Sequence, residues 1–421
     1  MNTQGSSHAA AVYFGLQGFE IEDVEILPRP TVGKPGRKAK VVTLRDVRGF
    51  HQCPKCGRRH WQGAFQESVP ITFRDCSLGD HVTLLRVYPW RVQCCGGTSR
   101  EALPFEQEGF RTTTRFFERI AALCTRATVH EVAQMADLSW DTVCRMDKKA
   151  IELALGGKEP DLDGVRKIGV DEVSRTGGRR FFTIVTDLES GRVIHVGDGK
   201  GKAAIQEFVD RLGARAKKIR VTTSDLGYLK KLQEAFPNAV HALDRFHTVK
   251  WMNDAVNEVR REVFGGAPDK EPGRTLKVKQ WMLLSAREDL DHSDKLHLKK
   301  LMELNLPLYQ AYLLKEELRS ILRHPWTYLG ALRTRLNSWC TATIESKVEK
   351  LAIVGNRVRK NVEAIIACFK EKVRQGLVEG TNSKIQRLRV QARGYRDKDY
   401  FKLKIFQRCS LPNNPWAEIV L

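Results

Sequence analysis

Two carboxylates stand at the end of an apolar run in the segment RKIGVDEVSRTGGRRFFTIVTDLESGRVIHV, residues 166–196. Residues 168–170 are typical of a buried strand, and Asp171 and Glu172 follow them directly. An ionised carboxylate is costly to bury without a partner, so Asp171 needs one. A second strand-like segment, VTTSDLGY, places Asp225 in the same position at its own end. A metal ion is a candidate partner for these acids.

The elements that must position the two acids follow from hydrophobic periodicity. Residues 165–245 predict strands over 167–173, 180–187, 192–197, 219–224 and 239–243, with helices near 201–213 and 227–236. Three hairpin-linked strands followed by alternating helices and strands predict a mixed α/β sheet. We expect the first and fourth strands to be neighbours, which puts Asp171 beside Asp225. Because adjacent carboxylates repel, a divalent ion such as Mg²⁺ or Mn²⁺ suits them. The alternative is that both acids only cap turns.

Closely spaced cysteines near the N-terminus indicate a second metal site. CPKC places two thiolates two residues apart, a spacing that lets both bind one tetrahedral ion, and CCGG follows after a β-rich stretch. We therefore expect residues 1–105 to form a β region with a zinc ribbon; a metal-free β domain is the alternative. The expected zinc ligands are Cys53, Cys56, Cys94 and Cys95, and the fourth position is open between Cys95, His60, His51 and no ligand.

In residues 106–152 the apolar residues recur with the spacing of an α-helix. TVHEVAQMADLSWDTVCRMDKKA has the spacing of a helix-turn-helix, with Val132, Ala136, Leu138, Val143 and Met146 facing inward. Ser139 can cap the second helix. A plain α-hairpin is the alternative. The candidates for contact with DNA are Ser139, Trp140, Arg145 and Lys148.

The rest of the chain is mainly helical and basic. Residues 246–369 predict an all-α domain, and residues 370–421 contain GLVEGTNSKIQRLRVQARGYRDKDYFKLKIF. In this segment Glu379, Asn382, Ser383 and Gln386 recur at i, i+3, i+4 and i+7 and form one polar helix face. By contrast, Glu345 and Glu349 interleave with lysines, which is typical of a solvated surface.

A basic stretch follows that polar face. We expect it to bind the DNA backbone, with Tyr395 and Tyr400 stacking on unpaired bases. A charged, solvated face is the alternative. Its DNA-binding candidates are Lys384, Arg387, Arg389 and Arg393.

Composition narrows the class of partner. The 421 residues include 71 Lys and Arg against 50 Asp and Glu, a formal charge of +21, and the excess extends from Arg29 to Arg408. A polyanion, nucleic acid ahead of membrane, is the expected partner. Because no apolar stretch is long enough to span a membrane and no signal peptide is visible, we expect an intracellular protein. The cysteines outside the zinc ribbon are then expected to be small buried hydrophobes and not disulfides; they are Cys76, Cys124, Cys144, Cys340, Cys368 and Cys409.

Three segments together carry a family resemblance: IGVDE with its hairpin, SDLGYLKKLQEAFPNAVHALDRFHTVK, and the GLVEGTNSKIQ segment. They resemble the catalytic blocks of DDE transposases from bacterial insertion sequences, specifically the ISL-three family, and the resemblance covers nearly the whole chain. It implies a multidomain α/β protein with a zinc-ribbon-like β domain, a helix-turn-helix, and a ribonuclease H-like core. That core comprises residues 165–245 and 370–421 and is interrupted by the all-α insertion 246–369.

The resemblance also implies the site. Asp171, Asp225 and Glu379 are the implied ligands of two Mg²⁺ or Mn²⁺ ions. DRFH resembles an accessory motif of such enzymes, which singles out Asp244 and His247; structural packing is the alternative for His247. Two metal ions about 4 Å apart can activate water or a 3′-hydroxyl for in-line attack on a phosphodiester. The implied reaction is hydrolysis at the element's end followed by attack of the freed 3′-hydroxyl on target DNA.

The expected partners are double-stranded DNA, namely the terminal inverted repeats and the target, and a second copy in a homodimer on DNA. The expected location is the bacterial cytoplasm, at the nucleoid. Two other functions stay open. One is a DNA-binding regulator with an inactive α/β domain, and the other is a nuclease or resolvase that performs hydrolysis only. A strand-transfer assay separates the nuclease from the transposase.

Overall fold

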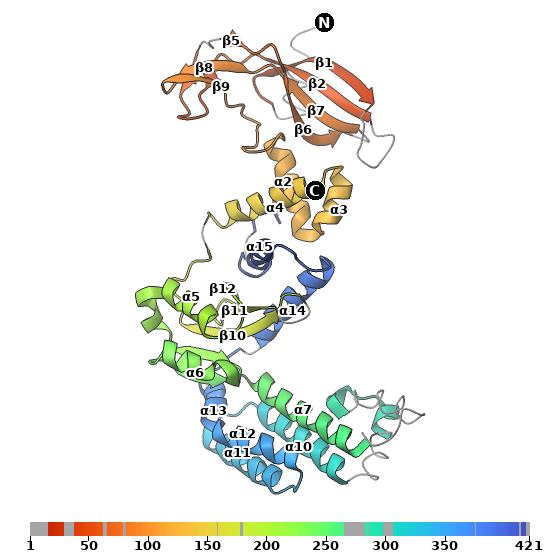
Figure 1. Ribbon diagram of the computed structural model, residues 1–421, viewed down its shortest axis with the longest axis vertical. Coiled ribbons are helices and arrows are strands. Elements are labelled where there is room, and N and C mark those ends of the chain that lie inside the picture. Colours follow the sequence, from red (N-terminus) through yellow and green to blue (C-terminus); the bar gives the residue numbers. More distant parts are fainter. Residues whose placement is uncertain are drawn as a thin grey trace. The chain divides into compact units, whose positions relative to one another are not determined.

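The computed structural model describes residues 16–28, 38–61, 65–78, 81–157, 159–176, 180–264, 283–285, 287–296, 298, 306–374, 376–411 and 414–417 (Figure 1). It divides into two compact units, residues 1–157 with 413–421, and residues 158–412. The expected loop GGAPDKEPGR, residues 265–274, lies outside the described residues.

The first unit begins with a β domain. Its main sheet has the order β1-β2-β7-β6, with β2 and β7 parallel and the other pairs antiparallel. Phe19, Phe73 and Leu85 are fully buried in its core. The strands are β1 (Phe19–Pro28), β2 (Lys38–Asp46), β6 (Ile71–Leu78) and β7 (His81–Val87); smaller sheets contain β3 (His51–Gln52) with β4 (Arg59–His60), and β5 (Phe65–Gln66) with β8 (Trp90–Cys94) and β9 (Gly97–Arg100).

A three-helix domain completes the first unit, with α2 (Thr114–Arg126), α3 (Val129–Ala136) and α4 (Trp140–Ala154). The five residues expected to face inward are buried or packed against the core, which confirms the predicted pattern. Asp137 adopts the left-handed conformation at φ 54°, and the Ser139 hydroxyl caps α4 by accepting from the Thr142 N–H at 3.2 Å. Trp416 also belongs to this unit, because its indole N–H donates to the Ala150 carbonyl at 2.9 Å.

The second unit contains a five-stranded sheet with the order β12-β11-β10-β13-β14. β10 to β12 are joined by antiparallel pairing, whereas β10, β13 and β14 run parallel. The predicted strands are confirmed to within two residues, and β10 and β13, the first and fourth, are neighbours as expected. The strands are β10 (Lys167–Ser174), β11 (Phe181–Asp187), β12 (Val193–Asp198), β13 (Val221–Ser224) and β14 (Val240–Leu243).

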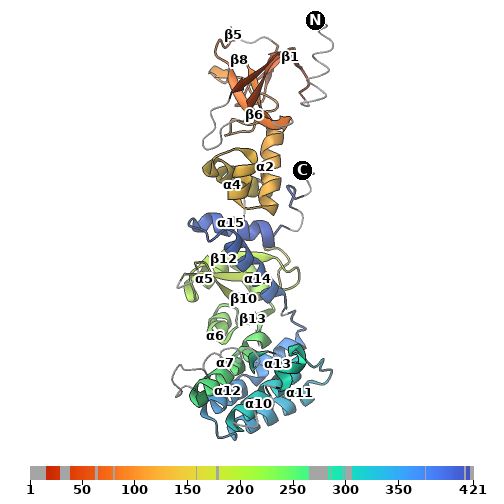
Figure 2. The same ribbon diagram turned by 90° about the vertical axis from the view of Figure 1, so that its right-hand side faces the viewer.

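Helices cover both faces of this sheet. One face packs on α5 (Lys202–Leu212) and α6 (Leu226–Ala235), which meet near the 3₁₀ helix η1 (Gly213–Lys218), and these helices share a core with Ile168 and Val170. The other face packs on α14 (Gly376–Gln391) and α15 (Lys398–Cys409); Phe182 of β11 lies 5.6 Å from Phe401 between ring centroids. Figure 2 shows α15 and α6 on opposite sides of the strands.

An all-α domain separates β14 from α14 in the sequence. Its helices with described bounds are α7 (Arg245–Phe264), α10 (Leu306–Arg323), α11 (Leu329–Ile344), α12 (Glu349–Lys360) and α13 (Val362–Lys370), together with a 3₁₀ helix η2 (Arg287–Asp289). Trp339 lies in its apolar core with 1% of its surface exposed. The last helix of the domain returns to the strand that precedes the domain, because the Cys368 thiol of α13 donates to the carbonyl of Leu243 in β14 at 2.8 Å.

One close contact sets α14 against β10. A Cβ atom at Gly169 would lie 2.6 Å from Cγ2 of Val378 and 3.0 Å from Cδ2 of Leu188. Val378 is buried, so the space beside Gly169 is filled by this side chain. Glycine is therefore required at this position in the strand for the helix to approach.

We predict that Gly169→Ala destabilises the protein by about 1–3 kcal/mol, because the added methyl overlaps Val378 in a packed core. Gly380→Ala is the matched control: it lies in α14 with nothing within 4 Å of its Cβ position, so it should be stabilising by about 0.5–1 kcal/mol. Denaturant unfolding measures both changes. Equal effects of the two substitutions would contradict the proposed overlap.

Candidate active site and nucleic-acid-binding surfaces

Asp171 lies on the face of β10 that packs on α14. Its Oδ1 accepts the backbone N–H of Glu172 at 2.7 Å, and its Oδ2 accepts the side-chain amide of Asn382 at 2.6 Å. Nε2 of His247 lies 3.8 Å from Oδ1. Burial raises the pKa of Asp171, the nearby Asp225 raises it further, and the hydrogen bonds and His247 oppose the shift.

Glu172 points to the opposite face of the strand. Its carboxylate accepts the hydroxyl of Tyr228 at 2.8 Å and forms an ion pair with Lys200 at 2.6 Å. Burial raises the pKa of Tyr228 to about 12, which keeps that hydroxyl a donor. Successive strand residues alternate between faces, so the two adjacent acids have separate environments.

Two further acids follow the neighbouring parallel strands. Asp225 comes directly after β13 and caps α6, with Oδ1 accepting the N–H of Tyr228 at 3.1 Å. Asp244 comes directly after β14 and accepts the N–H of Phe246 at 2.8 Å. Asp244 is buried, and this burial raises its pKa, as does the nearby Asp171. The middle of β10, where Asp171 pairs with Ile184 and does not end the strand, and the ends of β13 and β14 thus bring together Asp171, Asp225 and Asp244.

Glu379 begins the polar face of α14. It is exposed on the first turn of α14 and, within the described part of the chain, forms no hydrogen bond or ion pair. Asn382, three residues later on the same helix face, contacts Asp171 directly. Oδ1 of Asn382 is buried and, among the described residues, accepts no hydrogen bond. The predicted polar face of this helix identified Asn382, although not its contact with Asp171.

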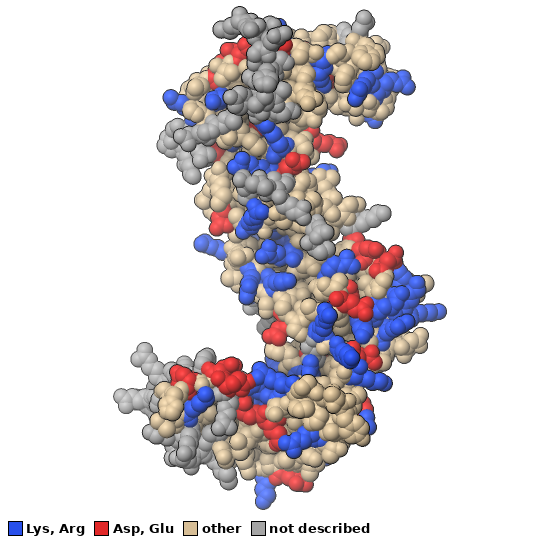
Figure 3. Space-filling model, turned by 180° about the vertical axis from the view of Figure 1, so that it is seen from behind, with Lys and Arg blue, Asp and Glu red and all other residues tan. Residues whose placement is uncertain are grey.

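The basic stretch lies along α14 and beyond its end. Lys384, Arg387 and Arg393 are exposed, whereas Arg389 donates to the backbone carbonyl of Ser174 at 3.3 Å. Figure 3 shows Lys and Arg side chains gathering on the surface of the second unit, where Lys217 and Lys218 of η1 are also exposed.

The two tyrosines of this stretch have a structural role. Tyr400 is buried, and the ring of Tyr395 stacks on Phe401 with centroids 4.4 Å apart. Tyr400 is therefore not available to stack on unpaired bases, because its ring is buried. Tyr395 is partly exposed beside Phe401, and its stacking on a base stays a prediction.

Four cysteines form a thiol cluster in the first unit. The sulfur atoms of Cys53, Cys56, Cys94 and Cys95 all lie within 4.8 Å of one another. Cys95 adopts φ 53° and Gly96 φ 74° in the two-residue turn between β8 and β9, which directs two consecutive thiols to one point. A hydrogen bond from the Cys56 N–H lowers the pKa of Cys53 to about 7, whereas the Cys56 thiol raises that of Cys95 to about 12. This tetrahedral spacing of soft ligands fits zinc.

The histidines considered for the fourth zinc position lie outside this cluster. His51 is buried beside Glu101, with Nδ1 at 3.2 Å from its Oε2 and Asp46 nearby. The guanidinium of Arg48 lies 2.6 Å from both acids and supplies their positive charge. His51, Asp46, Glu101 and Arg48 therefore form an ion-pair network.

Of the helix-turn-helix candidates, Ser139 is used as the helix cap. Trp140 and Arg145 are exposed on α4, and the Arg145 guanidinium lies 5.7 Å from the ring centroid of Phe110. Lys148 is half-buried. Four of the six cysteines outside the thiol cluster are buried as predicted, and Cys76 and Cys409 are partly buried. No helix in the described ranges is long and apolar enough to cross a membrane.

Comparison with known proteins identifies the class. Residues 168–405 match a family model described as "Transposase", of the DDE type, and residues 101–151 match the "Helix-turn-helix domain of transposase family ISL3". A DNA-binding helix-turn-helix followed by a DDE domain defines a transposase of an insertion sequence. The chain belongs to the ISL3 family of these enzymes, as its resemblance to the family predicted.

Two transposases of other insertion sequences are similar in sequence to this chain over most of its length. The transposase for insertion sequence element IS1001 of Bordetella parapertussis is 29% identical over 410 residues, covering 95% of this chain and 97% of that protein. The transposase for insertion sequence element IS1557 of Mycobacterium tuberculosis, from two strains, is 27% identical over 411 residues, covering 89% of each chain.

Proposed function

We propose that this transposase cleaves and joins DNA by metal-dependent chemistry at Asp171 of β10 and at the adjacent ends of β13 and β14. The observation that carries the proposal is the convergence of Asp171, Asp225 and Asp244, with His247 at 3.8 Å from Asp171. Asp171, Asp225 and Glu379 are the proposed ligands of two Mg²⁺ or Mn²⁺ ions. Asp244 and His247 are accessory residues that position the first acid.

The donor set supports divalent metal binding. Burial disfavours the ionised forms of Asp171 and Asp244, and a cation restores them. The buried, unpaired Oδ1 of Asn382 adds an oxygen of the kind that Mg²⁺ prefers. When bound, such ions activate water or a 3′-hydroxyl and stabilise the leaving oxygen. Asn382 holds the Asp171 carboxylate in place, and α14 presents Glu379 one helical turn before it.

The fold proposed for this core is ribonuclease H-like. Support comes from the sheet order β12-β11-β10-β13-β14 and from three hairpin-linked strands followed by two parallel ones. The proposed boundaries are 1–105, 106–152, 165–245, 246–369 and 370–421, with the helical insertion between the two parts of the core.

Binding to the terminal inverted repeats is assigned to the helix-turn-helix. Trp140, Arg145 and Lys148 are proposed to contact the major groove from α4, and Ser139 sets the start of that helix. Lys384, Arg387, Arg389 and Arg393 are proposed to bind the DNA backbone near the active site. An insertion sequence has two ends, and each end needs a DNA-binding domain and an active site. We therefore propose that the protein acts as a homodimer on DNA, at the bacterial nucleoid.

The thiol cluster is proposed to hold one structural Zn²⁺ through Cys53, Cys56, Cys94 and Cys95. Its support is the mutual approach of the four sulfur atoms. The metal would tie the turn after β8 to the CPKC knuckle, where the Gly57 N–H donates to the Cys53 carbonyl at 3.0 Å.

We predict that Asp171→Asn lowers cleavage and strand transfer by about three orders of magnitude, since loss of a metal ligand removes several kcal/mol of transition-state stabilisation. Glu172→Gln is the matched control on the next residue, whose side chain points to the other face; it should stay within about tenfold of the wild type. An assay with labelled element ends and target DNA measures both steps. Activity lost in Glu172→Gln and kept in Asp171→Asn would reverse the assignment.

The same assay distinguishes the two other functions. A regulator with an inactive α/β domain would bind element ends without cutting them. A hydrolysis-only nuclease would cut them without forming joined product. Joined product from the wild-type chain is the result expected of the proposed transposase.

We predict that Glu379→Gln abolishes cleavage while element-end binding stays nearly unchanged, because the substitution keeps the side-chain shape but removes a charge that the metals need. Glu363→Gln serves as control, since this exposed acid on α13 forms an ion pair with Arg333 at 2.6 Å and, among the described residues, no other. Gel-shift and cleavage measurements on both variants test the assignment. If only Glu363→Gln were inactive, Glu379 would not be the third ligand.

We predict one zinc per chain in protein purified without chelators, and loss of that zinc in Cys95→Ser. Metal binding deprotonates the thiols, so acidification, which favours the protonated thiols, should also release the metal. Cys409→Ser, a change of the same type at a partly buried thiol outside the cluster, should retain full zinc content. Metal analysis that finds no zinc in the wild type refutes the site.

A further inference from the structure

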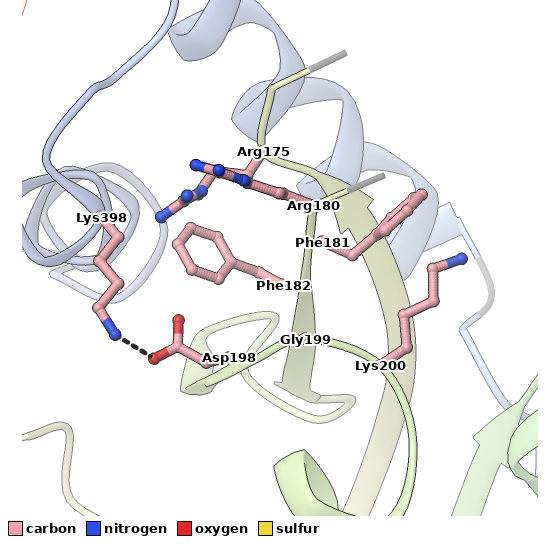
Figure 4. Close-up of a pocket in the computed structure, with 8 residues that line it drawn as sticks. All are labelled: Arg175, Arg180, Phe181, Phe182, Asp198, Gly199, Lys200 and Lys398. Carbon is pink, nitrogen blue, oxygen red and sulfur yellow. Dashed lines mark hydrogen bonds and ion pairs between the residues drawn. The ribbon is translucent and has the colours of Figure 1, made fainter. Parts of the chain in front are cut away.

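A pocket of about 470 Å³ opens at the end of the β10–β11 hairpin (Figure 4). Its charged lining consists of Arg175, Arg180, Lys200 and Lys398 against a single carboxylate, Asp198. The volume lies within the usual range for small-ligand sites. Four cations facing one acid favour an anionic ligand.

The two arginines carry the uncompensated charge. Asp198 already pairs with Lys398 at 3.0 Å and with Lys402 at 3.2 Å, and Lys200 pairs with Glu172. Among the described residues no carboxylate pairs with Arg175 or Arg180. In Figure 4 both guanidinium groups lie on the side of the Phe182 ring away from Asp198. Because arginine forms paired hydrogen bonds with phosphate oxygens, two adjacent guanidinium groups suit a phosphate.

Strand register places this pair on the face of the catalytic acid. The Arg175 N–H donates to the Arg180 carbonyl at 2.8 Å, continuing the pairing of β10 with β11. Side chains alternate along a strand, so Asp171, Val173 and Arg175 share the face covered by α14. Four residues at about 3.3 Å each put Arg175 roughly 13 Å beyond Asp171.

We propose that Arg175 and Arg180 bind a backbone phosphate of the DNA strand whose cleaved bond lies at Asp171. This inference rests on the proposed function and adds a second contact point on the same strand. Arg389 lies between the two points, because its guanidinium donates to the carbonyl of Ser174. At about 3.4 Å of axis per nucleotide in a duplex strand, the pocket is about four nucleotides from the cleaved bond.

The test uses the full chain and a labelled single strand of about 20 nucleotides, longer than a typical single-strand site. Each lost phosphate contact reduces the slope of log K against log salt by about 0.7. Arg175→Ala combined with Arg180→Ala removes one phosphate contact and should therefore flatten the slope by about 0.7, so that affinity changes about 2.6-fold less between 50 and 200 mM salt. Thermal unfolding checks that the variant is folded.

The matched control removes the same charge elsewhere. Lys217→Ala combined with Lys218→Ala neutralises two exposed lysines just before β13, at the end of the sheet opposite the hairpin. This variant should leave the salt slope within experimental error of the wild type. An unchanged slope in the folded arginine variant, or an equal flattening in the lysine variant, would overturn the proposal. Cleavage by the wild type tests the proposed function separately, since the slope is measured without any reaction.

Discussion

The contact between Val378 and Gly169 fixes how the last segment of the core meets the first. The helix α14 follows the all-α insertion and must pack on β10 in one particular alignment. Because Gly169 has no side chain, Val378 of α14 can pack against the strand at this position. From there the helix advances about 1.5 Å and the strand about 3.3 Å per residue. Asn382 then reaches Asp171, and Arg389 reaches Ser174. Glu379 lies on the same helix, three residues before Asn382.

The pair Asp171-Glu172 shows how one strand supports two different acids. Strand alternation separates them, and each finds partners on its own face. Glu172 is compensated by a cation and a hydroxyl, so it is satisfied within the protein. Among the described residues, Asp171 receives an amide, one backbone N–H and a histidine at 3.8 Å, and its pKa is raised. The difference in compensation, and not the position in sequence, distinguishes the acid proposed to bind metal from the one that is paired within the protein.

Three features could be predicted from the sequence because each depends on local periodicity or topology. They are the strand positions, the inward faces of the helix-turn-helix, and the placement of β10 next to β13. The turn at Cys95 could not be predicted, since a left-handed residue that brings consecutive thiols together has no periodic signal. The packing of Tyr395 on Phe401 depends on how the chain returns after Gly394, and the attachment of Trp416 to α4 joins residues far apart in sequence. Such long-range contacts leave no local pattern from which they can be predicted.

The acids of the site are positioned before any ion binds, because backbone groups hold them. Asp225 caps α6 and Asp244 accepts the N–H of Phe246, so each carboxylate is oriented by the strand-to-helix turn that carries it. The capping alternative and the ligand hypothesis are therefore compatible, since one oxygen serves the turn and the other remains available. These hydrogen bonds do not offset burial at Asp244, whose pKa stays raised. A preformed group of acids that is not fully compensated by the protein gains stability from a divalent cation, which couples metal binding to the geometry that the strands already provide.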